Sequence, residues 1–302
     1  MSGIISTGSF PKALWPGVKK WYGQAYNDYP VEYTELFETL SSDKSFEEIV
    51  GTSGLGLAVV KGEGAPVTYD SEQQGFTTRA QHVNYGLGFI ITEEMMDDDQ
   101  YMLVGERRSK ALARSMRQTK ELVAANVYNR AFNTSYTGGD GKAMIVSDHP
   151  LISGGTFSNV IATAADISEA ALEQAVIDIA GFTDDRGLLI AVRPEALIIP
   201  RQINFEVQRI LKSNLRVDTP NNDANVLKML GSIPKVVINH YLTDSDAWFI
   251  RTSEPGLHYF ERKADSFAQD NDFDTSNAKF KATGRYSFIW SDPRTIYGSP
   301  GA

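Results

Sequence analysis

The feature that most constrains this chain is a polar, glycine-punctuated stretch at residues 57–92 that runs directly into a long helical segment. The flanks of the stretch alternate as β-strands do, while its middle, 61–75, is too polar to enter a hydrophobic core. Compact domains rarely contain so long a loop unless the loop has a function. Two strands with a polar tip predict an arm that lies on a neighbouring copy of the chain, which favours assembly over catalysis.

Residues 93–133 predict a single helix of about forty residues, because no proline interrupts them. Thr92 can cap its start, and Glu93 and Glu94 lie where the helix dipole favours negative charge. At 1.5 Å per residue the helix would span roughly 60 Å, more than the diameter of a small domain. We therefore expect a spine from which other parts extend. Its apolar stripe comprises Leu112, Met116, Val123 and Val127.

The first fifty residues are rich in aromatic side chains, and Trp15, Val18, Tyr22 and Tyr26 have helical spacing. So many large rings need a surface to pack against. Two interpretations remain open here: a helix docked on the core of its own chain, or an arm packed on an adjacent subunit.

Residues 160–252 alternate between helical and strand patterns and predict a compact α/β unit. Two further β-like runs, 257–262 and 279–290, follow in the tail. The predicted elements of the unit are a helix at 168–181 capped by Ser168, strands at 188–193 and 196–199, a helix at 201–212 with Phe205 and Ile210 inward, and strands at 235–239 and 247–251.

Composition excludes several classes of protein. The 302 residues include no cysteine, so disulfides, thiolate nucleophiles and cysteine-based zinc sites are excluded. A formal net charge of −9 argues against nucleic-acid binding through the whole surface. No run approaches the roughly 18 apolar residues of a membrane span, and we expect a soluble protein made in the cytosol.

Two motifs suggest catalysis only superficially. The glycine-rich segment 51–56 lacks the Gly-Lys-Ser/Thr ending of a phosphate loop, and we interpret it as a flexible hinge at the base of the arm. Ser147, Asp148 and His149 are adjacent in sequence, so their side chains point in different directions and cannot relay a proton.

Metal binding has little support in the sequence. The acids at 93–99 lack the spacing of a calcium loop and fit a helix start, while those at 270–274 leave weak calcium binding or a solvated loop open. The four histidines are scattered and form no metal motif. We predict no catalytic, cofactor-binding or metal-binding residue.

A local basic cluster lies on the predicted spine. In an acidic protein such a cluster faces phosphates or an acidic neighbour, or is an ordinary solvated helix face. No aromatic residue interleaves it, so base-specific recognition is not expected. The cluster comprises Arg107, Arg108, Lys110, Arg114, Arg117 and Lys120.

Three long segments resemble the major capsid protein of tailed bacteriophages, in particular the Mu-like major head subunit. They are YDSEQQGFTTRAQHVNYGLGFIIT (69–92), DGKAMIVSDHPLISGGTFSN (140–159) and FERKADSFAQDNDFDTSNAKFKATGRYSFIWSDPRTIYGSPG (260–301). The resemblance implies an α+β, HK97-like capsid fold. Its parts would be an N-arm (1–56), an extended E-loop hairpin (57–92), the spine helix with the first part of the peripheral domain (93–159), an α/β axial domain (160–252) and the C-terminal strands of the peripheral domain (253–302).

This family implies a non-enzymatic protein that self-assembles as pentamers and hexamers into an icosahedral head enclosing double-stranded DNA. The implied partners are other copies of the chain, a separate scaffold protein, a portal protein, a decoration protein and packaged DNA, with no membrane and no cofactor. The implied location is the virion, after assembly in the bacterial host cytoplasm. The six basic residues of the spine would face DNA, and the E-loop residues expected to contact the next subunit are Lys61, Glu63, Asp70, Glu72 and Arg79.

Two alternatives remain. An encapsulin-type compartment would share the fold but hold an enzyme cargo, and neighbouring genes would distinguish it from a phage head. A soluble α/β enzyme would need a convergent polar site, which the sequence does not offer.

Overall fold

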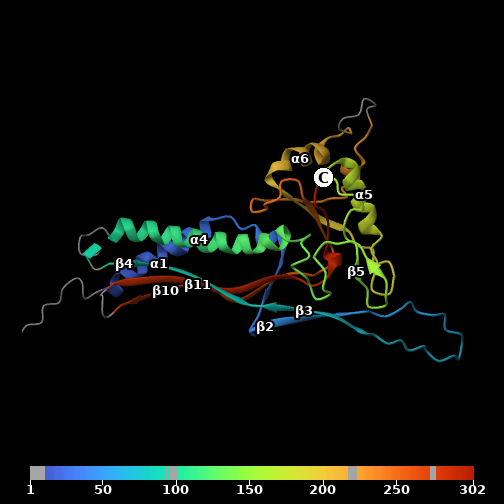
Figure 1. The fold of residues 1–302 in the computed structure, drawn as a ribbon, viewed down its shortest axis with the longest axis horizontal. Helices are drawn as coiled ribbons and strands as arrows, with labels where there is room; N and C mark the ends of the chain where they lie inside the picture. Colours follow the sequence, from blue (N-terminus) through green and yellow to red (C-terminus); the bar gives the residue numbers. More distant parts are fainter. Residues whose placement is uncertain (1–10, 93, 96–100, 217–222, 273–276) are drawn as a thin grey trace, which may run out of the picture.

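A long antiparallel hairpin forms the frame of the molecule. The computed structural model describes residues 11–92, 94–95, 101–216, 223–272 and 277–302. In it β10 (Leu257–Asn271) pairs with β11 (Ala278–Trp290) along most of their length. Two further strands extend the sheet: β1 (Glu38–Ser41) lies parallel to β10, and β4 (Val83–Ile91) lies antiparallel to β11. Figure 1 shows this elongated sheet below the long helix.

The spine helix is present as α4 (Tyr101–Asn129), whose described part spans about 44 Å. Its predicted start at 93–100 lies largely outside the described residues. The predicted stripe does face inward, since Leu112 and Met116 are buried and Val123 and Val127 pack against a second core cluster. The prediction of an apolar face is therefore confirmed.

The N-terminal helix α1 (Pro11–Asp28) docks on its own chain. Tyr22 and Ala25 pack with Leu112 and Met116 of α4, and the Tyr22 ring lies 5.0 Å from that of Phe267 in β10. A short helix, α2 (Tyr33–Leu36), follows and is held by the buried Glu121, which accepts the N–H groups of Glu32 and Tyr33. Of the two interpretations of the aromatic segment, this structure shows the packing on its own core.

The α/β unit is built on a sheet of strand order β12–β9–β7–β8. The predicted cap is confirmed, because the Ser168 hydroxyl accepts the N–H of Ala171. Small elements complete the fold: β5 (His149–Pro150), β6 (Thr156–Phe157) and two 3-10 turns, η2 (Arg201–Ile203) and η3 (Pro293–Thr295). The main elements are α5 (Glu169–Ala180), β7 (Pro194–Pro200), α6 (Asn204–Lys212), α7 (Val226–Leu230), β8 (Val236–Asn239), β9 (Trp248–Thr252) and β12 (Ile296–Ser299).

Three predictions for this unit differ from the structure. The prediction of a strand at 188–193 was wrong. This segment forms only an isolated bridge, between Leu189 and Thr183, because it closes a turn at the surface. Phe205 does not point inward but is 74% exposed. The α/β unit was predicted to end at residue 252, but the last strand, β12, pairs with β9. The tail therefore contributes a strand to the α/β sheet as well as the two strands of the long hairpin.

The α/β sheet has a hydrophobic core on each face. One face packs against α5, α6 and α7 through residues such as Leu172, Val207 and Trp248. The other packs against the end of the spine, where Ile198 and Phe249 share a cluster with Tyr128. The second cluster also contains residues of β10 and β11, so the spine and the α/β unit are held together by a common core.

A buried ion pair joins the helix to the hairpin. Irregular pairing in β10 on either side of Lys263 turns Asp265 inward, as β-bulges do. There the Asp265 carboxylate lies 3.0 Å from the Lys120 ammonium, and both side chains are almost fully buried. The Tyr26 hydroxyl of α1 also donates to Asp265. Arg117 is buried against the Tyr26 ring, 4.2 Å from its centroid. The expectation that Lys120 and Arg117 face DNA is therefore wrong.

His82 fixes the point where the chain passes from β3 (Gln74–Gln81) to β4. Its two ring nitrogens lie 3.0 Å from the hydroxyls of Ser287 and Ser42, and the side chain is buried. Burial first, and the nearby positive charge of Arg285 second, lower the pKa of His82 below its usual 6.5; Arg262 acts in the same direction and Glu47 opposes it.

Replacing Lys120 by Met should lower the free energy of unfolding by about 3–5 kcal/mol, because it leaves the buried Asp265 carboxylate without its counter-ion. Urea unfolding of the unassembled subunit measures this. The control is Lys110→Met, which removes an exposed pair with Glu106 and should cost no more than about 0.5 kcal/mol. Equal losses in the two variants would contradict the structural role of Lys120.

Acidification from pH 7 to 5.5 should lower the melting temperature. The unfolded chain takes up a proton at His82 near pH 6.5, whereas the folded chain does so only at lower pH, so stability is lost as pH falls through this window. His82→Gln should show a smaller decrease than the wild type when both are followed by thermal unfolding. An unchanged decrease would mean that His82 is not a source of the pH dependence.

Candidate assembly site

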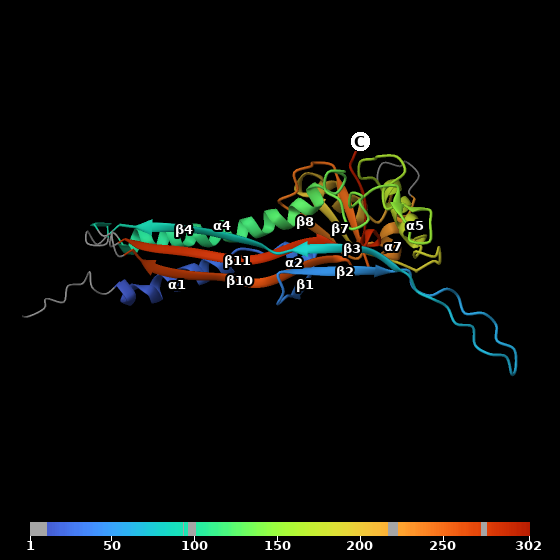
Figure 2. The ribbon, with the colours of Figure 1, turned by 60° about the horizontal axis from the view of Figure 1, so that its bottom comes forward.

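An arm extends from the body beyond the two-stranded sheet of β2 (Phe46–Thr52) and β3. The outer part of the loop between them, 57–69, projects away from the body, as Figure 2 shows. The E-loop was predicted to start at residue 57. Because β2 and β3 form the base of the arm as a second hairpin, the arm starts earlier in the sequence. The described segment 57–69 makes one intrachain hydrogen bond, from Ala65 N–H to Gly62 C=O. Most of its backbone groups therefore have no partner in this chain.

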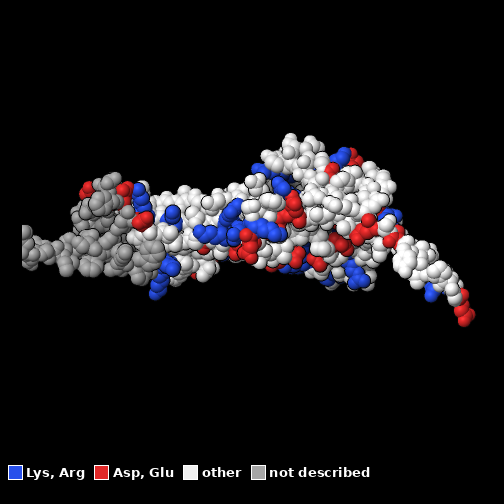
Figure 3. All heavy atoms as spheres, turned by 90° about the horizontal axis from the view of Figure 1, so that it is seen from below, with Lys and Arg blue, Asp and Glu red and all other residues white. Residues whose placement is uncertain are grey.

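The arm also exposes apolar side chains. Val60 is 100% exposed, Tyr69 93% and Leu57 78%, and Val59 and Val67 are exposed as well. In Figure 3 most of the projecting loop is uncharged, with a few charged residues toward its tip. The prediction from the sequence treated the middle of this loop, 61–75, as polar and so missed the exposed Val67 and Tyr69. The alternation Val67-Thr-Tyr69 was the available signal.

The five predicted E-loop residues fall into two groups. Lys61, Glu63 and Glu72 are exposed on the loop. Asp70 is instead paired with Arg186 of its own chain, and Arg79 lies 2.7 Å from Glu48 across the hairpin. The structure therefore gives Asp70 and Arg79 partners within the subunit.

The base of the arm fits tightly against the body. A Cβ added at Gly75 would lie 2.5 Å from Ile152 Cδ1, and one added at Gly139 would lie 2.6 Å from the Thr77 carbonyl oxygen. Residues 51 and 52 are part of β2 rather than a free linker. Ser53 is paired as well, because its N–H donates to the Gln73 carbonyl and its hydroxyl accepts the N–H of Gln73. The first three residues of the expected flexible hinge at 51–56 are therefore held within the chain.

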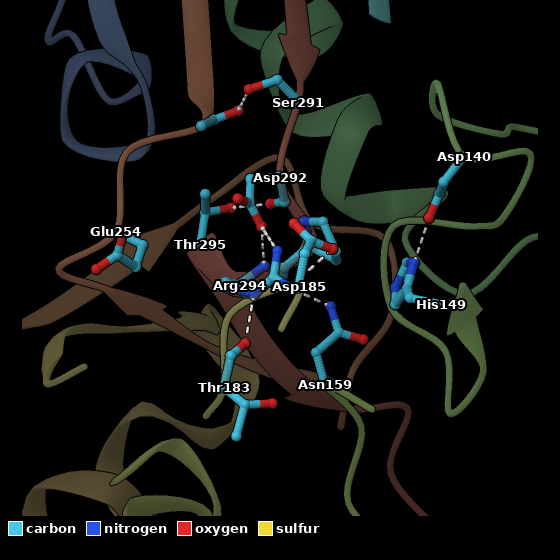
Figure 4. A network of polar contacts seen from close by, with 12 residues as sticks. Asp140, His149, Asn159, Thr183, Asp185, Glu254, Ser291, Asp292, Arg294 and Thr295 are labelled. Carbon is cyan, nitrogen blue, oxygen red and sulfur yellow. Dashed lines mark hydrogen bonds and ion pairs between the residues drawn. The ribbon is translucent and has the colours of Figure 1, made fainter. Parts of the chain in front are cut away.

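Beneath this base lies a network of buried polar groups, shown in Figure 4. Arg294 lies 3.3 Å from Asp185 and 3.4 Å from Asp292, and it donates to the Thr183 carbonyl at 2.7 Å. His149 Nδ1 lies 2.6 Å from Asp140. Apart from Thr183, these residues and Gly51 line a cavity of about 90 Å³. The contacts of Arg294 tie the C-terminal segment to the turn after α5, and the base of the arm lies against the same cavity.

The adjacent Ser147, Asp148 and His149 do not form a triad. Asp140, not Asp148, bonds to the His149 ring, while Asp148 is exposed and pairs with Lys142. Among the described residues, no group of three or more potential ligands is arranged to hold a metal ion, and no helix is long and apolar enough to cross a membrane. Of the acids at 93–99 and 270–274, those at 93, 97–99 and 274 lie outside the described part of the chain.

The α/β unit exposes several large apolar side chains. On α6 and α7, Phe205, Met229 and Leu230 are all more than 70% exposed. Ile177 of α5 and Leu189 of the following turn are exposed elsewhere on the unit. Exposed apolar side chains mark surfaces that contact other proteins where they lie together.

The remaining basic residues of the spine lie on its exposed face. Arg107, Lys110 and Arg114 have the i, i+3, i+7 spacing that places them along one side of the helix. Lys110 pairs with Glu106, and Arg108 donates to the Ile90 carbonyl of β4 at 2.7 Å. Four of the six predicted basic residues are therefore at the surface.

The phage capsid protein family matches residues 75–299, well over half of the chain. The chain belongs to this family. It is a structural, shell-forming protein of the virion capsid rather than an enzyme. No curated protein sequence matches it.

Solved capsid structures share the fold of this phage capsid protein. The capsid of the native GTA particle superposes with a TM-score of 0.54 at 12% identity, covering 100% of this chain and 93% of that one. The procapsid of bacteriophage JBD30 superposes with a TM-score of 0.52 at 15% identity, covering 98% of this chain and 76% of that one. The virus-like particle from Pyrococcus furiosus superposes with a TM-score of 0.52 at 9% identity, covering 94% of this chain and 98% of that one. At these identities the similarity shows the fold alone, and it confirms the HK97-like α+β architecture. Membership of the Mu-like group stays a prediction.

Proposed function

We propose that this capsid protein forms pentamers and hexamers that build an icosahedral phage head around double-stranded DNA, with the arm of each subunit lying on the next. The observation that carries this proposal is the segment 57–69, which combines exposed apolar side chains with unpartnered backbone groups. Exposed extended chain of this kind is an unfavourable surface in isolation and a good one for pairing with another protein.

The arm is long enough to reach a neighbour. At about 3.3 Å per residue, the outgoing limb 53–62 spans roughly 30 Å beyond the end of β2. A subunit that holds one neighbour and is held by another makes head-to-tail contacts, which close into rings. When several such contacts hold each subunit, the shell is far more stable than any single pair.

The exposed apolar side chains of the α/β unit support a role for this unit at the ring centres. Phe205, Met229 and Leu230 are exposed on α6 and α7, and Ile177 and Leu189 are exposed on α5 and the turn after it. Two different surfaces on one unit suit a head-to-tail ring, in which each copy presents one surface to its left neighbour and the other to its right.

The exposed basic face of the spine supports contact with packaged DNA. Arg107 and Arg114 lie on this face of an otherwise acidic protein, as electrostatic binding of phosphates would require. Lys110 and Arg108 lie nearby, partly engaged with Glu106 and the Ile90 carbonyl. The remaining partners that we propose are a separate scaffold protein, a portal protein and a decoration protein, with assembly in the bacterial host cytoplasm. Family membership favours the phage head over an encapsulin-type compartment, whose fold would be the same.

Replacing residues 57–69 by a short Gly-Ser turn should leave a folded subunit that makes no shells, because the segment packs on nothing within its own chain. Circular dichroism tests folding, and electron microscopy of the protein expressed alone and with its scaffold tests assembly. A length-matched variant, with Leu57, Val60 and Tyr69 replaced by Ser, isolates the contribution of the apolar side chains. Normal particles from the first variant would contradict the proposed role of the arm.

Arg107→Glu combined with Arg114→Glu should reduce the DNA retained per particle without preventing shell formation. Both side chains lie on the exposed face of α4, and charge reversal replaces attraction for phosphates by repulsion. The ratio of DNA to protein in purified heads measures this. Reversal at Lys19 and Lys20 on α1 is the control for a general change of charge. Unchanged DNA content in the first variant would mean that this face does not contact the genome.

A further inference from the structure

One contact crosses from the arm to the α/β unit. Arg186, in the turn after α5, binds the Asp70 carboxylate with both terminal nitrogens, the second at 3.4 Å, and donates to the Ser71 carbonyl at 2.5 Å. Two-pronged contacts between a guanidinium and a carboxylate fix direction as well as distance. The contact joins residues more than one hundred positions apart in the sequence.

The same carboxylate also joins the two limbs of the arm. Asp70 lies on the limb that returns to β3, and it accepts the N–H of Gly56 on the outgoing limb at 2.8 Å. It accepts the N–H of Ser71 at 2.8 Å as well. Donation from Gly56 first, then from Arg186 and Ser71, lowers the pKa of Asp70 to about 2. The carboxylate is therefore charged at any pH near neutrality.

The turn that carries Arg186 is itself rigid. The Asp184 carboxylate accepts the N–H groups of Arg186 and Leu188, both at 2.8 Å. Thr183 bridges to Leu189, and its carbonyl accepts a hydrogen bond from the buried Arg294. Arg186 is thus presented from a closed turn that is anchored in the polar network beneath the arm.

Gly56 leaves room for the contact. A Cβ at this position would lie 3.0 Å from Arg186 Nη1 and 3.2 Å from Asp70 Oδ2. The backbone of Gly56 has no positive φ, so a larger residue could adopt its conformation and would disturb only the contact.

We propose that Arg186 is a positioning residue that sets the direction of the arm. Its contact with Asp70, here called the clamp, holds the arm up to Gly56 and from Asp70 onward. The segment 57–69 remains as the free tip. The inference rests on the proposed role of the arm in assembly. A partly exposed ion pair contributes little to stability, so its use here is to restrict the directions in which the tip can point. A neighbour then meets an arm that is already oriented, and less conformational entropy is lost on assembly.

Amide hydrogen exchange on the unassembled subunit tests whether the clamp exists. In Arg186→Gln, the amides of Gly56 and Ser71 should exchange at least about tenfold faster than in the wild type, because Asp70 is no longer held. Gly56→Val should have the same effect at Ser71, by crowding instead of by loss of charge. Equal exchange in all three proteins would overturn the inference whatever the assembly assay shows.

Assembly yield tests what the clamp does. Arg186→Gln should give at least about tenfold fewer normal shells at a limiting subunit concentration, with a melting temperature within about 2 °C of the wild type. Asp70→Asn should match it, and the double variant should be no worse than either single one, because both remove one contact. Arg193→Gln, which removes an exposed arginine from the same unit, should assemble normally.

The outcomes separate this inference from the proposed function. Normal yield from Arg186→Gln, alongside failure of the variant that lacks 57–69, would overturn the clamp and leave the role of the arm standing. If the wild type formed no shells, the proposed function would fail, and the exchange measurement would still decide whether Arg186 holds the arm.

Discussion

Segment 57–69 exposes apolar side chains, and most of its backbone groups have no partner within the described part of the chain. These groups can be buried and paired only by contact with another chain. A chain that stayed a monomer would keep a long, hydrated and aggregation-prone loop for no gain in stability. A second copy can supply what is missing. The family match and the shared fold of solved capsids agree with a protein whose final contacts are made between subunits.

An arm of this kind needs a stiff support, which the body supplies. The buried Lys120–Asp265 pair locks the spine helix to the long hairpin, and one shared core joins that frame to the α/β unit. Close packing at Gly75 and Gly139 seats the base of the arm, and the network around Arg294 holds the turn that carries Arg186. In the function that we propose, the rigid body sets the direction of the arm and the extended tip makes the contact with the neighbour.

Local signals in the sequence were sufficient for the elements with strong periodicity or capping. The stripe of α4, the Ser168 cap and the alternation of β11 all predicted what the structure shows. Features that depend on tertiary contacts could not be predicted. A bulge in β10 turns Asp265 inward and buries Lys120, which on the helix alone looks like any solvated basic residue. Likewise, nothing near Arg186 in the sequence indicates that its partner is Asp70.

Amide hydrogen exchange at residues 57–69, compared between the free subunit and the assembled shell, tests the central claim most directly. Completion of the arm by another copy predicts fast exchange throughout this segment in the free subunit and strong protection in the shell, while the amides of β2 and β3 are protected in both. Fast exchange of 57–69 in intact shells, or equal protection in the free subunit, would contradict it.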